Sequence, residues 1–210
     1  MTAPRIHPSA HVSEGARLED GVSVWQNAQV RENTRIGARS VIGMGTYIDA
    51  GVTVGADCKF QNYVCTYHGL TIEDGVFCGP CVVFTNDLNP RAIRADGGLK
   101  SADDWTCSPT LIKYGAALGA NSTIVCGTTV GRWALVAAGS VVTKDVPDYA
   151  LVMGNPARVR GFVSPHGFKM TAEAEPADGD TVVRMRCSKS NEIYEISAAD
   201  FRAWRAASRA

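Results

Sequence analysis

The sequence lacks net charge, long apolar runs and a recognisable leader. Its 21 basic residues are balanced by 21 acidic residues, so there is no basic footprint of the kind that nucleic acid or an anionic membrane requires. No apolar run approaches the roughly 20 residues that cross a bilayer. The first residues, MTAPRIHPSAHVSEG, contain no apolar core of a secretory signal. We therefore expect a cytoplasmic protein that binds neither nucleic acid nor membrane.

Patterns of cysteine and histidine that hold metals are also missing. The seven cysteines are an odd number, and Cys78 and Cys81 form the one C-x-x-C of the chain. A disulfide framework and a cysteine zinc site are therefore both disfavoured. Only four histidines are present and only His68 lies in the middle of the chain, which counts against the three-histidine zinc site of a carbonic anhydrase. We expect reduced thiols and no bound metal.

What the sequence does contain is a repeat of six residues. From Ile6 to Phe84 every sixth residue is apolar, with Thr66 as the one exception among fourteen positions. A helix would repeat at 3.6 residues and a half-buried strand at two, whereas a period of six fits short strands separated by corners. Three such strands make a triangular coil, and coils stack at the strand spacing of about 4.8 Å. Residues one coil apart then form apolar columns inside the prism.

The repeat is interrupted once. It stops after Phe84 and resumes at Ile112, which is 28 residues further on instead of six, and then continues to Val142. About 22 residues, roughly Asn86–Pro109, are therefore extruded as one loop, and insertions in solenoids often carry function. The hexads make about seven coils in total, and we expect the repeat to resume on the third face of the prism.

One edge of the expected prism carries the residues with chemical potential. His68 and Asn86 are 18 residues apart, so they occupy the same corner on successive coils, about 5 Å apart. The inferred register extends this edge in both directions, and in chain order it consists of Glu14, Glu32, Ala50, His68, Asn86, Cys126 and Lys144. The long loop begins at the middle of this edge, so we expect the functional site there.

These stretches resemble a known family. The six-residue repeat is similar to that of the hexapeptide-repeat acyltransferases, which implies a left-handed parallel β-helix and a homotrimer with acyl-CoA and acceptor bound between subunits. Over roughly residues 6–165 the chain more specifically resembles the nucleotide-sugar N-acetyltransferases that acetylate 3-amino sugars on UDP or dTDP. That resemblance rests on QNYVCTYHGLTIEDGVFCGPCVVFTNDLNPRA and on GANSTIVCGTTVGRWALVAAGSVVTKDVPDYALVMGNPARVRGFVS. Its most specific part is the FTN…NPR segment of the loop.

The resemblance implies acetyl transfer from acetyl-CoA to the amine of a nucleotide-linked amino sugar, by direct attack on the thioester. His68 is the candidate base because histidine titrates near neutral pH; otherwise it is a solvent-facing corner residue. The resembling 3-amino-sugar enzymes often have an acidic residue there, whereas a histidine is the usual base across the wider family. Asn86 matches the FTN asparagine and either binds the acceptor or satisfies its own turn. Glu73 either orients His68 or is a turn residue.

Three loop residues are candidates for binding the acceptor. Asp87 directly follows the FTN asparagine, and Arg91 and Arg94 lie further along the loop. A guanidinium pairs well with phosphate or carboxylate oxygens. The two arginines therefore either hold a diphosphate or sugar carboxylate, or are solvated loop residues.

Five residues near the end of the repeat are candidates for binding acetyl-CoA. Lys144 in VVTKDVP and Arg158 in GNPARV match positions where related acyltransferases place basic side chains near the phosphates of CoA. Gly127 either offers a backbone N–H to the thioester carbonyl or simply makes a tight corner. Ala138 and Gly139 either leave room for the pantetheine arm or allow close coil packing.

Two regions are expected, a β-helix acyltransferase domain at 1–160 and a C-terminal appendage at 161–210. The appendage should contain short strands and a terminal helix that starts at the capping pattern Ser197–Asp200. It resembles a degenerate zinc ribbon but has a single cysteine, Cys187, and no set of metal ligands, so we expect no metal there. Two other functions stay open for the whole chain: O-acetylation of a sugar or small acceptor, and a binding or scaffold role without catalysis.

Overall fold

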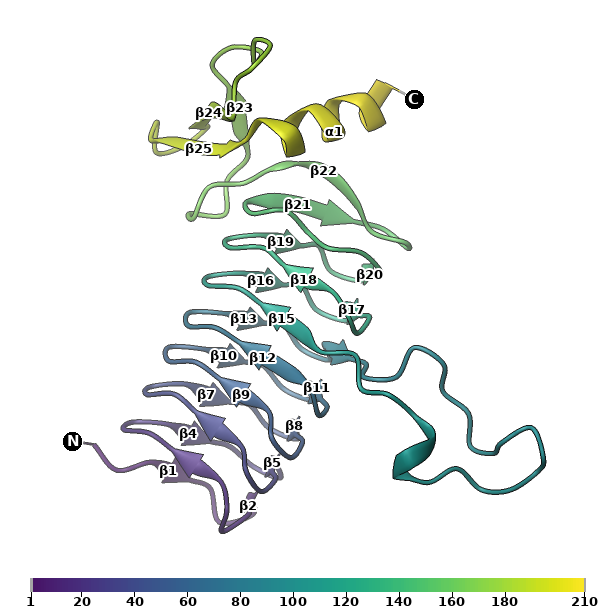
Figure 1. The fold of residues 1–210 in the computed structure, drawn as a ribbon. Helices are drawn as coiled ribbons and strands as arrows, with labels where there is room; N and C mark the ends of the chain where they lie inside the picture. Colours follow the sequence, from purple (N-terminus) through teal and green to yellow (C-terminus); the bar gives the residue numbers. More distant parts are fainter. Residues whose placement is uncertain (1, 210) are drawn as a thin grey trace.

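The computed structural model describes residues 2–209 and shows a triangular column of stacked coils (Figure 1). The first sheet contains β1 (Arg5–Ile6), β4 (Ser23–Val24), β7 (Val41–Ile42), β10 (Lys59–Phe60), β13 (Phe77–Cys78), β16 (Ala117–Leu118), β19 (Leu135–Val136), β21 (Ala150–Met153) and the antiparallel β22 (Arg158–Phe162). The second sheet contains β2 (His11–Val12), β5 (Gln29–Val30), β8 (Tyr47–Ile48), β11 (Cys65–Thr66), β14 (Val83–Phe84), β17 (Thr123–Ile124) and β20 (Val141–Val142). The third contains β3 (Arg17–Leu18), β6 (Arg35–Ile36), β9 (Thr53–Val54), β12 (Leu70–Ile72), β15 (Thr110–Ile112) and β18 (Thr129–Val130).

The register of these sheets is the one that the six-residue period predicts. Successive strands of a sheet are parallel, and Ile48 pairs with Thr66 one coil later. Across the interruption Ile72 pairs with Ile112, so the repeat resumes on the third sheet, as expected. The sheets contain nine, seven and six strands, close to the seven coils expected. The prediction of a left-handed parallel β-helix with one extruded loop and a C-terminal appendage is confirmed.

The inward residue of each hexad forms the core. The largest aliphatic side chains that are fully buried in the column are Ile36, Ile42, Ile48, Ile72, Ile112, Leu118 and Ile124. Burial of one such side chain stabilises the fold by roughly 1.5–3 kcal/mol. Thr66, the polar exception, is also fully buried, because its Oγ1 donates a hydrogen bond to the Tyr47 carbonyl at 3.0 Å. At the open N-terminal end Ile6 remains 45% exposed.

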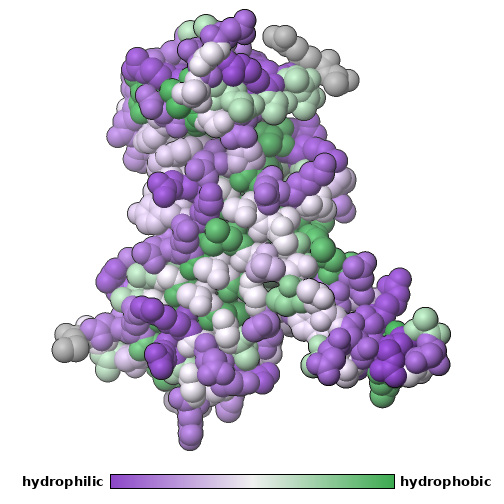
Figure 2. Space-filling model, in the orientation of Figure 1, coloured by the Kyte–Doolittle hydropathy of each residue, from purple (hydrophilic) through white to green (hydrophobic). Residues whose placement is uncertain are grey.

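The interruption forms one loop between β14 and β15. It includes a short 3₁₀ helix (Ala102–Asp104) and an isolated bridge between Ile93 and Leu99. The loop projects from the body of the column in both the ribbon and the space-filling view (Figures 1 and 2). Ile93 and Leu99 remain exposed, so the outer part of the loop adds nothing to the core.

The C-terminal segment covers the last coil (Figure 1). It consists of the antiparallel strands β23 (Met170–Ala172), β24 (Val182–Cys187) and β25 (Ile193–Ser197), followed by the helix α1 (Ala198–Arg209). The Ser197 hydroxyl accepts a hydrogen bond from the Asp200 amide at 3.2 Å, which is the expected cap. Phe201 and Trp204 of α1 pack on Phe162 of β22, with ring centroids 6.4 and 5.6 Å from that of Phe162. The helix therefore shields the apolar end of the column.

The apolar residues of this segment belong to the same core cluster as those of the coils. The expected boundary at residue 160 lies inside β22, and the division into two domains stays a prediction. Within residues 2–209, no helix is long and apolar enough to span a bilayer.

Candidate functional site

The edge that follows the second sheet brings together the residues that were predicted from the sequence to stack there. Cys65 of β11 pairs with Val83 of β14, and Val83 pairs with Thr123 of β17. Thr123 pairs in turn with Val141 of β20. The residues beyond these strands therefore stack in the predicted order, which is Glu14, Glu32, Ala50, His68, Asn86, Cys126 and Lys144. We call this stack the His68 edge.

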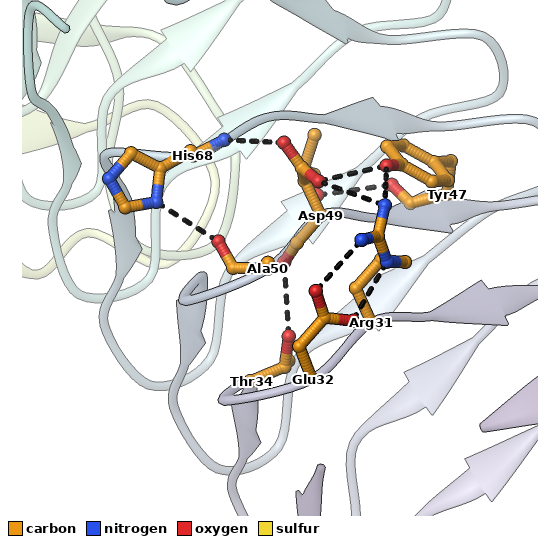
Figure 3. A network of polar contacts seen from close by, with 8 residues as sticks. Arg31, Glu32, Thr34, Tyr47, Asp49, Ala50 and His68 are labelled. Carbon is orange, nitrogen blue, oxygen red and sulfur yellow. Dashed lines mark hydrogen bonds and ion pairs between the residues drawn. The ribbon is translucent and has the colours of Figure 1, made fainter. Parts of the chain in front are cut away.

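His68 is exposed and held at two points by the coil before it (Figure 3). Its backbone N–H donates to Asp49 Oδ2 at 3.1 Å, and its ring Nδ1 lies 3.1 Å from the Ala50 carbonyl oxygen. A carbonyl only accepts hydrogen bonds, so Nδ1 carries the proton in this contact. The other ring nitrogen, Nε2, is then unprotonated in the neutral ring and is able to take a proton from an amine.

Asp49 belongs to a network that sequence reasoning did not identify. Its Oδ1 accepts a hydrogen bond from the Tyr47 hydroxyl at 2.8 Å and lies 3.9 Å from Arg31 Nη1. Arg31 also donates to both carboxylate oxygens of Glu32, at 2.8 and 2.9 Å. Partial burial raises the pKa of Asp49, but hydrogen bonds from Tyr47 and from backbone amides outweigh it and hold the pKa below its usual value. Asp49 is therefore a carboxylate at neutral pH.

A signal for this network was present in the sequence. Arg31 and Asp49 each follow an inward residue of the second sheet directly, and they are 18 residues apart. Opposite charges one coil apart on the same outward column indicate an ion pair. The same column continues to Tyr67, whose ring centroid lies 5.9 Å from that of Tyr47.

The base of the extruded loop closes on the His68 edge. Cys107 Sγ donates to the His68 carbonyl at 3.3 Å, and the Thr110 amide donates to the Gly69 carbonyl at 3.0 Å. The Ser108 amide donates to the Asn86 carbonyl at 3.2 Å. Asn86 is half-buried, and its side-chain amide has no hydrogen-bond partner in the described part of the chain. The polar end of Asn86 is therefore available beside His68.

The corner amides of the His68 edge are unpaired from Gly69 onward, because within residues 2–209 those of Gly69, Asp87, Gly127 and Asp145 have no hydrogen-bond acceptor. Gly51 and Gly127 occupy the equivalent position at this corner on different coils. The Gly51 amide donates to the Glu32 carbonyl of the preceding coil at 3.1 Å. The equivalent acceptor for Gly127 is the Asn86 carbonyl, which instead accepts from Ser108. Between residues 2 and 209 the Gly127 N–H has no partner, and Gly127 is exposed with a φ of +77°. An L-residue rarely adopts that conformation, so glycine fits this corner.

The loop candidates have different surroundings. Asp87 Oδ1 accepts from the Asn89 amide at 2.7 Å and shapes the start of the loop. Arg94 holds the tip, with Nη1 3.3 Å from Asp104 Oδ2 and 3.1 Å from the Leu99 carbonyl. Arg91 is exposed, and its Nη1 donates to the carbonyl of the preceding proline. Asp87 and Arg94 thus make hydrogen bonds that stabilise the conformation of the loop itself.

Glu73 lies on a different edge from His68. It follows β12 of the third sheet, and its Oε2 accepts from the Tyr114 amide at 2.8 Å. No hydrogen bond joins it to His68 among the described residues; it lines a surface cavity of about 610 Å³ together with Arg35 and Arg132. The strand β12 lies between His68 and Glu73 and places Glu73 at the next corner, where it bonds the Tyr114 amide; a role for Glu73 in orienting His68 stays a prediction. The carboxylate that does contact His68 is that of Asp49.

The candidates for acetyl-CoA binding fall on two edges. Lys144 ends the His68 edge and lines a cavity of about 170 Å³ together with Arg158 of β22. Both side chains are exposed, so the structure brings these two cations to one site. Ala138 and Gly139 lie on the corner between β19 and β20, which belongs to the next edge. A side chain at Gly139 would meet open space, and its φ of +71° favours glycine at this corner independently of coil packing.

A family model described as the hexapeptide repeat of succinyl-transferase matches residues 32–62 and 114–144. The two matches lie on either side of the extruded loop, and the prediction of hexapeptide repeats is confirmed. Within the described range of the chain, no group of three or more metal-binding side chains occurs.

Several known proteins are similar to this chain. A dTDP-3-amino-3,6-dideoxy-alpha-D-galactopyranose 3-N-acetyltransferase of Aneurinibacillus thermoaerophilus is 61% identical over 54 residues, which cover 26% of this chain and 28% of that enzyme. Serine acetyltransferase 4 of Arabidopsis thaliana is 32% identical over 168 residues, 80% of this chain and 32% of that enzyme. The chain thus spans about a third or less of the length of these curated relatives.

Solved structures are also similar to it. One is a mutant of perosamine N-acetyltransferase from Caulobacter crescentus in complex with CoA and GDP-perosamine, with 25% identity and a TM-score of 0.42. That match covers 76% of this chain and 57% of the other.

Proposed function

We propose that this hexapeptide-repeat chain is an acetyl-CoA-dependent N-acetyltransferase that acts on the amine of a nucleotide-linked amino sugar. The observation that carries the proposal is the His68 edge, which places an imidazole held through Nδ1, an asparagine amide and a backbone N–H without partners among the described residues, and a cation on successive coils. The 61% identity to a dTDP-3-amino-sugar N-acetyltransferase supports the choice of acceptor.

The geometry suits direct transfer between two bound substrates. His68 and Gly127 are two coils apart, which is about 10 Å. That span accommodates a hydrogen bond from the amine to His68, the attack distance of about 3–3.5 Å and a hydrogen bond from the Gly127 N–H to the carbonyl oxygen. Asn86 lies on the coil between them and would hold the acceptor amine or sugar.

The reaction balances without a covalent enzyme intermediate. The lone pair of the amine attacks the thioester carbonyl carbon, and the carbonyl electron pair moves to oxygen, which the Gly127 N–H stabilises. His68 Nε2 takes the proton of the amine. The C–S bond then breaks, and the CoA thiolate leaves and takes the proton from His68. The products are the N-acetylated sugar nucleotide and CoA.

The remaining candidates bind the two ends of the substrates. Lys144 and Arg158 would hold the phosphates of CoA. The corner at Ala138 and Gly139 is exposed and would leave room for the pantetheine arm if it faced the His68 edge of another subunit. Such a facing edge would come from a neighbouring subunit, so the proposal includes a homotrimer with sites between subunits. Arg91 would contact the diphosphate of the acceptor, while Asp87 and Arg94 shape the loop that carries it. The proposal also places the protein in the cytoplasm, where acetyl-CoA is available.

A thiol-release assay tests this function. The protein is incubated with acetyl-CoA and a panel of UDP-, dTDP- and GDP-linked amino sugars, and the acetylated product is identified by mass spectrometry. We expect turnover with at least one amino sugar and none with the matching hydroxyl sugar. No turnover with any acceptor, together with no binding of CoA in calorimetry, would favour a scaffold role.

A second candidate is O-acetylation of a small hydroxyl acceptor. It is favoured by the match to a serine acetyltransferase, which covers 80% of this chain. Serine and hydroxyl sugars belong in the same panel for this reason. Release of thiol with serine and not with amino sugars would select this candidate.

A further inference from the structure

The turn Asp49–Ala50 holds His68 by two hydrogen bonds (Figure 3). The Asp49 carboxylate binds the backbone N–H of His68 and the Ala50 carbonyl binds the ring Nδ1, each at 3.1 Å. The first bond holds the His68 backbone in the position from which the ring reaches the carbonyl. Loss of the Asp49 contact would therefore weaken the hydrogen bond between the ring and the Ala50 carbonyl. The preference for the tautomer that is protonated at Nδ1 would weaken with it.

The Asp49 carboxylate uses its two oxygens for different tasks. Oδ2 accepts from His68, whereas Oδ1 accepts from the Tyr47 hydroxyl and faces Arg31. An asparagine has only one oxygen, so it could keep only one of these contacts while its NH₂ group would face a donor. The side chain of Asp49 is only 19% exposed, which limits replacement of the lost contacts by water.

We infer that Asp49 is a positioning residue for His68, held in place by Tyr47 and Arg31, and that it fixes the tautomer with a free Nε2. This inference rests on the proposed role of His68 as the base. Asp49 acts through the backbone and orientation of His68 and is not itself in contact with the reacting atoms.

The chain offers a matched control at another edge. Glu19 pairs with Arg35 at 2.7 Å and accepts a hydrogen bond from the Ala38 amide at 3.1 Å. Both Glu19 and Asp49 accept from an amide 19 residues later, and both face an arginine. Glu19→Gln therefore perturbs the same kind of contacts away from His68, as Asp49→Asn does on the His68 edge.

The first measurement is the tautomer of His68, read from ¹⁵N chemical shifts of histidine-labelled protein at pH 8. The His68 signals are assigned by their absence in His68→Asn. We expect the Nδ1-protonated form in the wild type and in Glu19→Gln. In Asp49→Ala we expect a shift toward the Nε2-protonated form that free histidine favours in water, and in Asp49→Asn a smaller shift. This measurement needs no turnover, so it tests the inference even if the proposed function fails.

The second measurement is the steady-state rate with the acceptor found in the thiol-release assay. Misplacement of a catalytic group costs about tenfold to a hundredfold, so we expect kcat of Asp49→Ala to fall about tenfold, with the KM for acetyl-CoA within about twofold. Tyr47→Phe should fall less, and Glu19→Gln should match the wild type. A wild-type tautomer and kcat in Asp49→Ala would overturn the inference. Equal losses in Glu19→Gln would also overturn it, because they would indicate a general effect on coil packing.

Discussion

His68→Asn should lower kcat by about a hundredfold, while the KM for acetyl-CoA stays near the wild-type value. Asparagine keeps the backbone N–H that binds Asp49, so the corner is expected to fold as before. It has no group that takes a proton at neutral pH. Loss of a general base typically costs 10²–10⁴ in rate. The low end applies here because the ring is exposed and water can reach the amine; a hundredfold loss corresponds to about 2.7 kcal/mol of transition-state stabilisation.

The assay is thiol release at saturating acetyl-CoA and acceptor, with thermal unfolding to show that the variant is folded. His166→Asn is the matched control, since that histidine contacts Glu192 in the C-terminal segment at 2.6 Å and lies on no coil. An unchanged kcat in His68→Asn would refute the assignment of His68 as the base. A loss of the same size in His166→Asn would show that the assay reports stability and not chemistry.

Three further predictions concern the C-terminal end of the column. Lys144→Ala should raise the apparent KM for acetyl-CoA about fivefold with little change in kcat, since an exposed charge pair contributes up to about 1 kcal/mol; a change confined to the KM of the sugar would mean that the cofactor end is inverted. Phe201→Ala should lower the free energy of unfolding by about 3 kcal/mol in denaturant titrations because its ring is fully buried, whereas Leu99→Ala, 79% exposed, should leave it unchanged. Hydrogen bonds from Tyr194, Ser190 and His166 lower the pKa of Glu192 to about 2, so its stabilising effect is present above its unfolded pKa near 4.5 and is lost as the pH falls toward 2. Glu192→Gln should reduce the fall of the unfolding midpoint over that range, and an unchanged pH profile would contradict the assignment.

The sequence predicted most of the coil geometry because the period is strict. Each hexad needs one inward apolar residue, so the columns and the stacking of His68, Asn86 and Lys144 follow from counting. The register across the loop was predictable for the same reason, since only one face lets Ile112 stack on Ile72. Burial of a repeating side chain thus fixes position more strongly than any local propensity.

The details of the site depended on contacts that the period does not specify. Glu73 is close to His68 in sequence, but the intervening strand places it on another edge. The role of Asp49 depends on a side-chain oxygen that reaches a backbone amide one coil away, which requires the shape of the corner. The composition of the loop does not predict that the Ser108 amide would bind the Asn86 carbonyl.

The His68 edge departs from the regular pairing of the other two edges. At most corners of those edges the backbone amide donates to a carbonyl of the coil before it, as Gly45 does to Gln26 and Gly75 does to Ala56. Among the described residues, the amides of Gly69, Asp87, Gly127 and Asp145 on the His68 edge have no such partner. They lie on four successive coils, and the inserted loop leaves the column at the second of them. Under the proposed function, the donors that a regular stack uses for its own pairing are left here for a ligand.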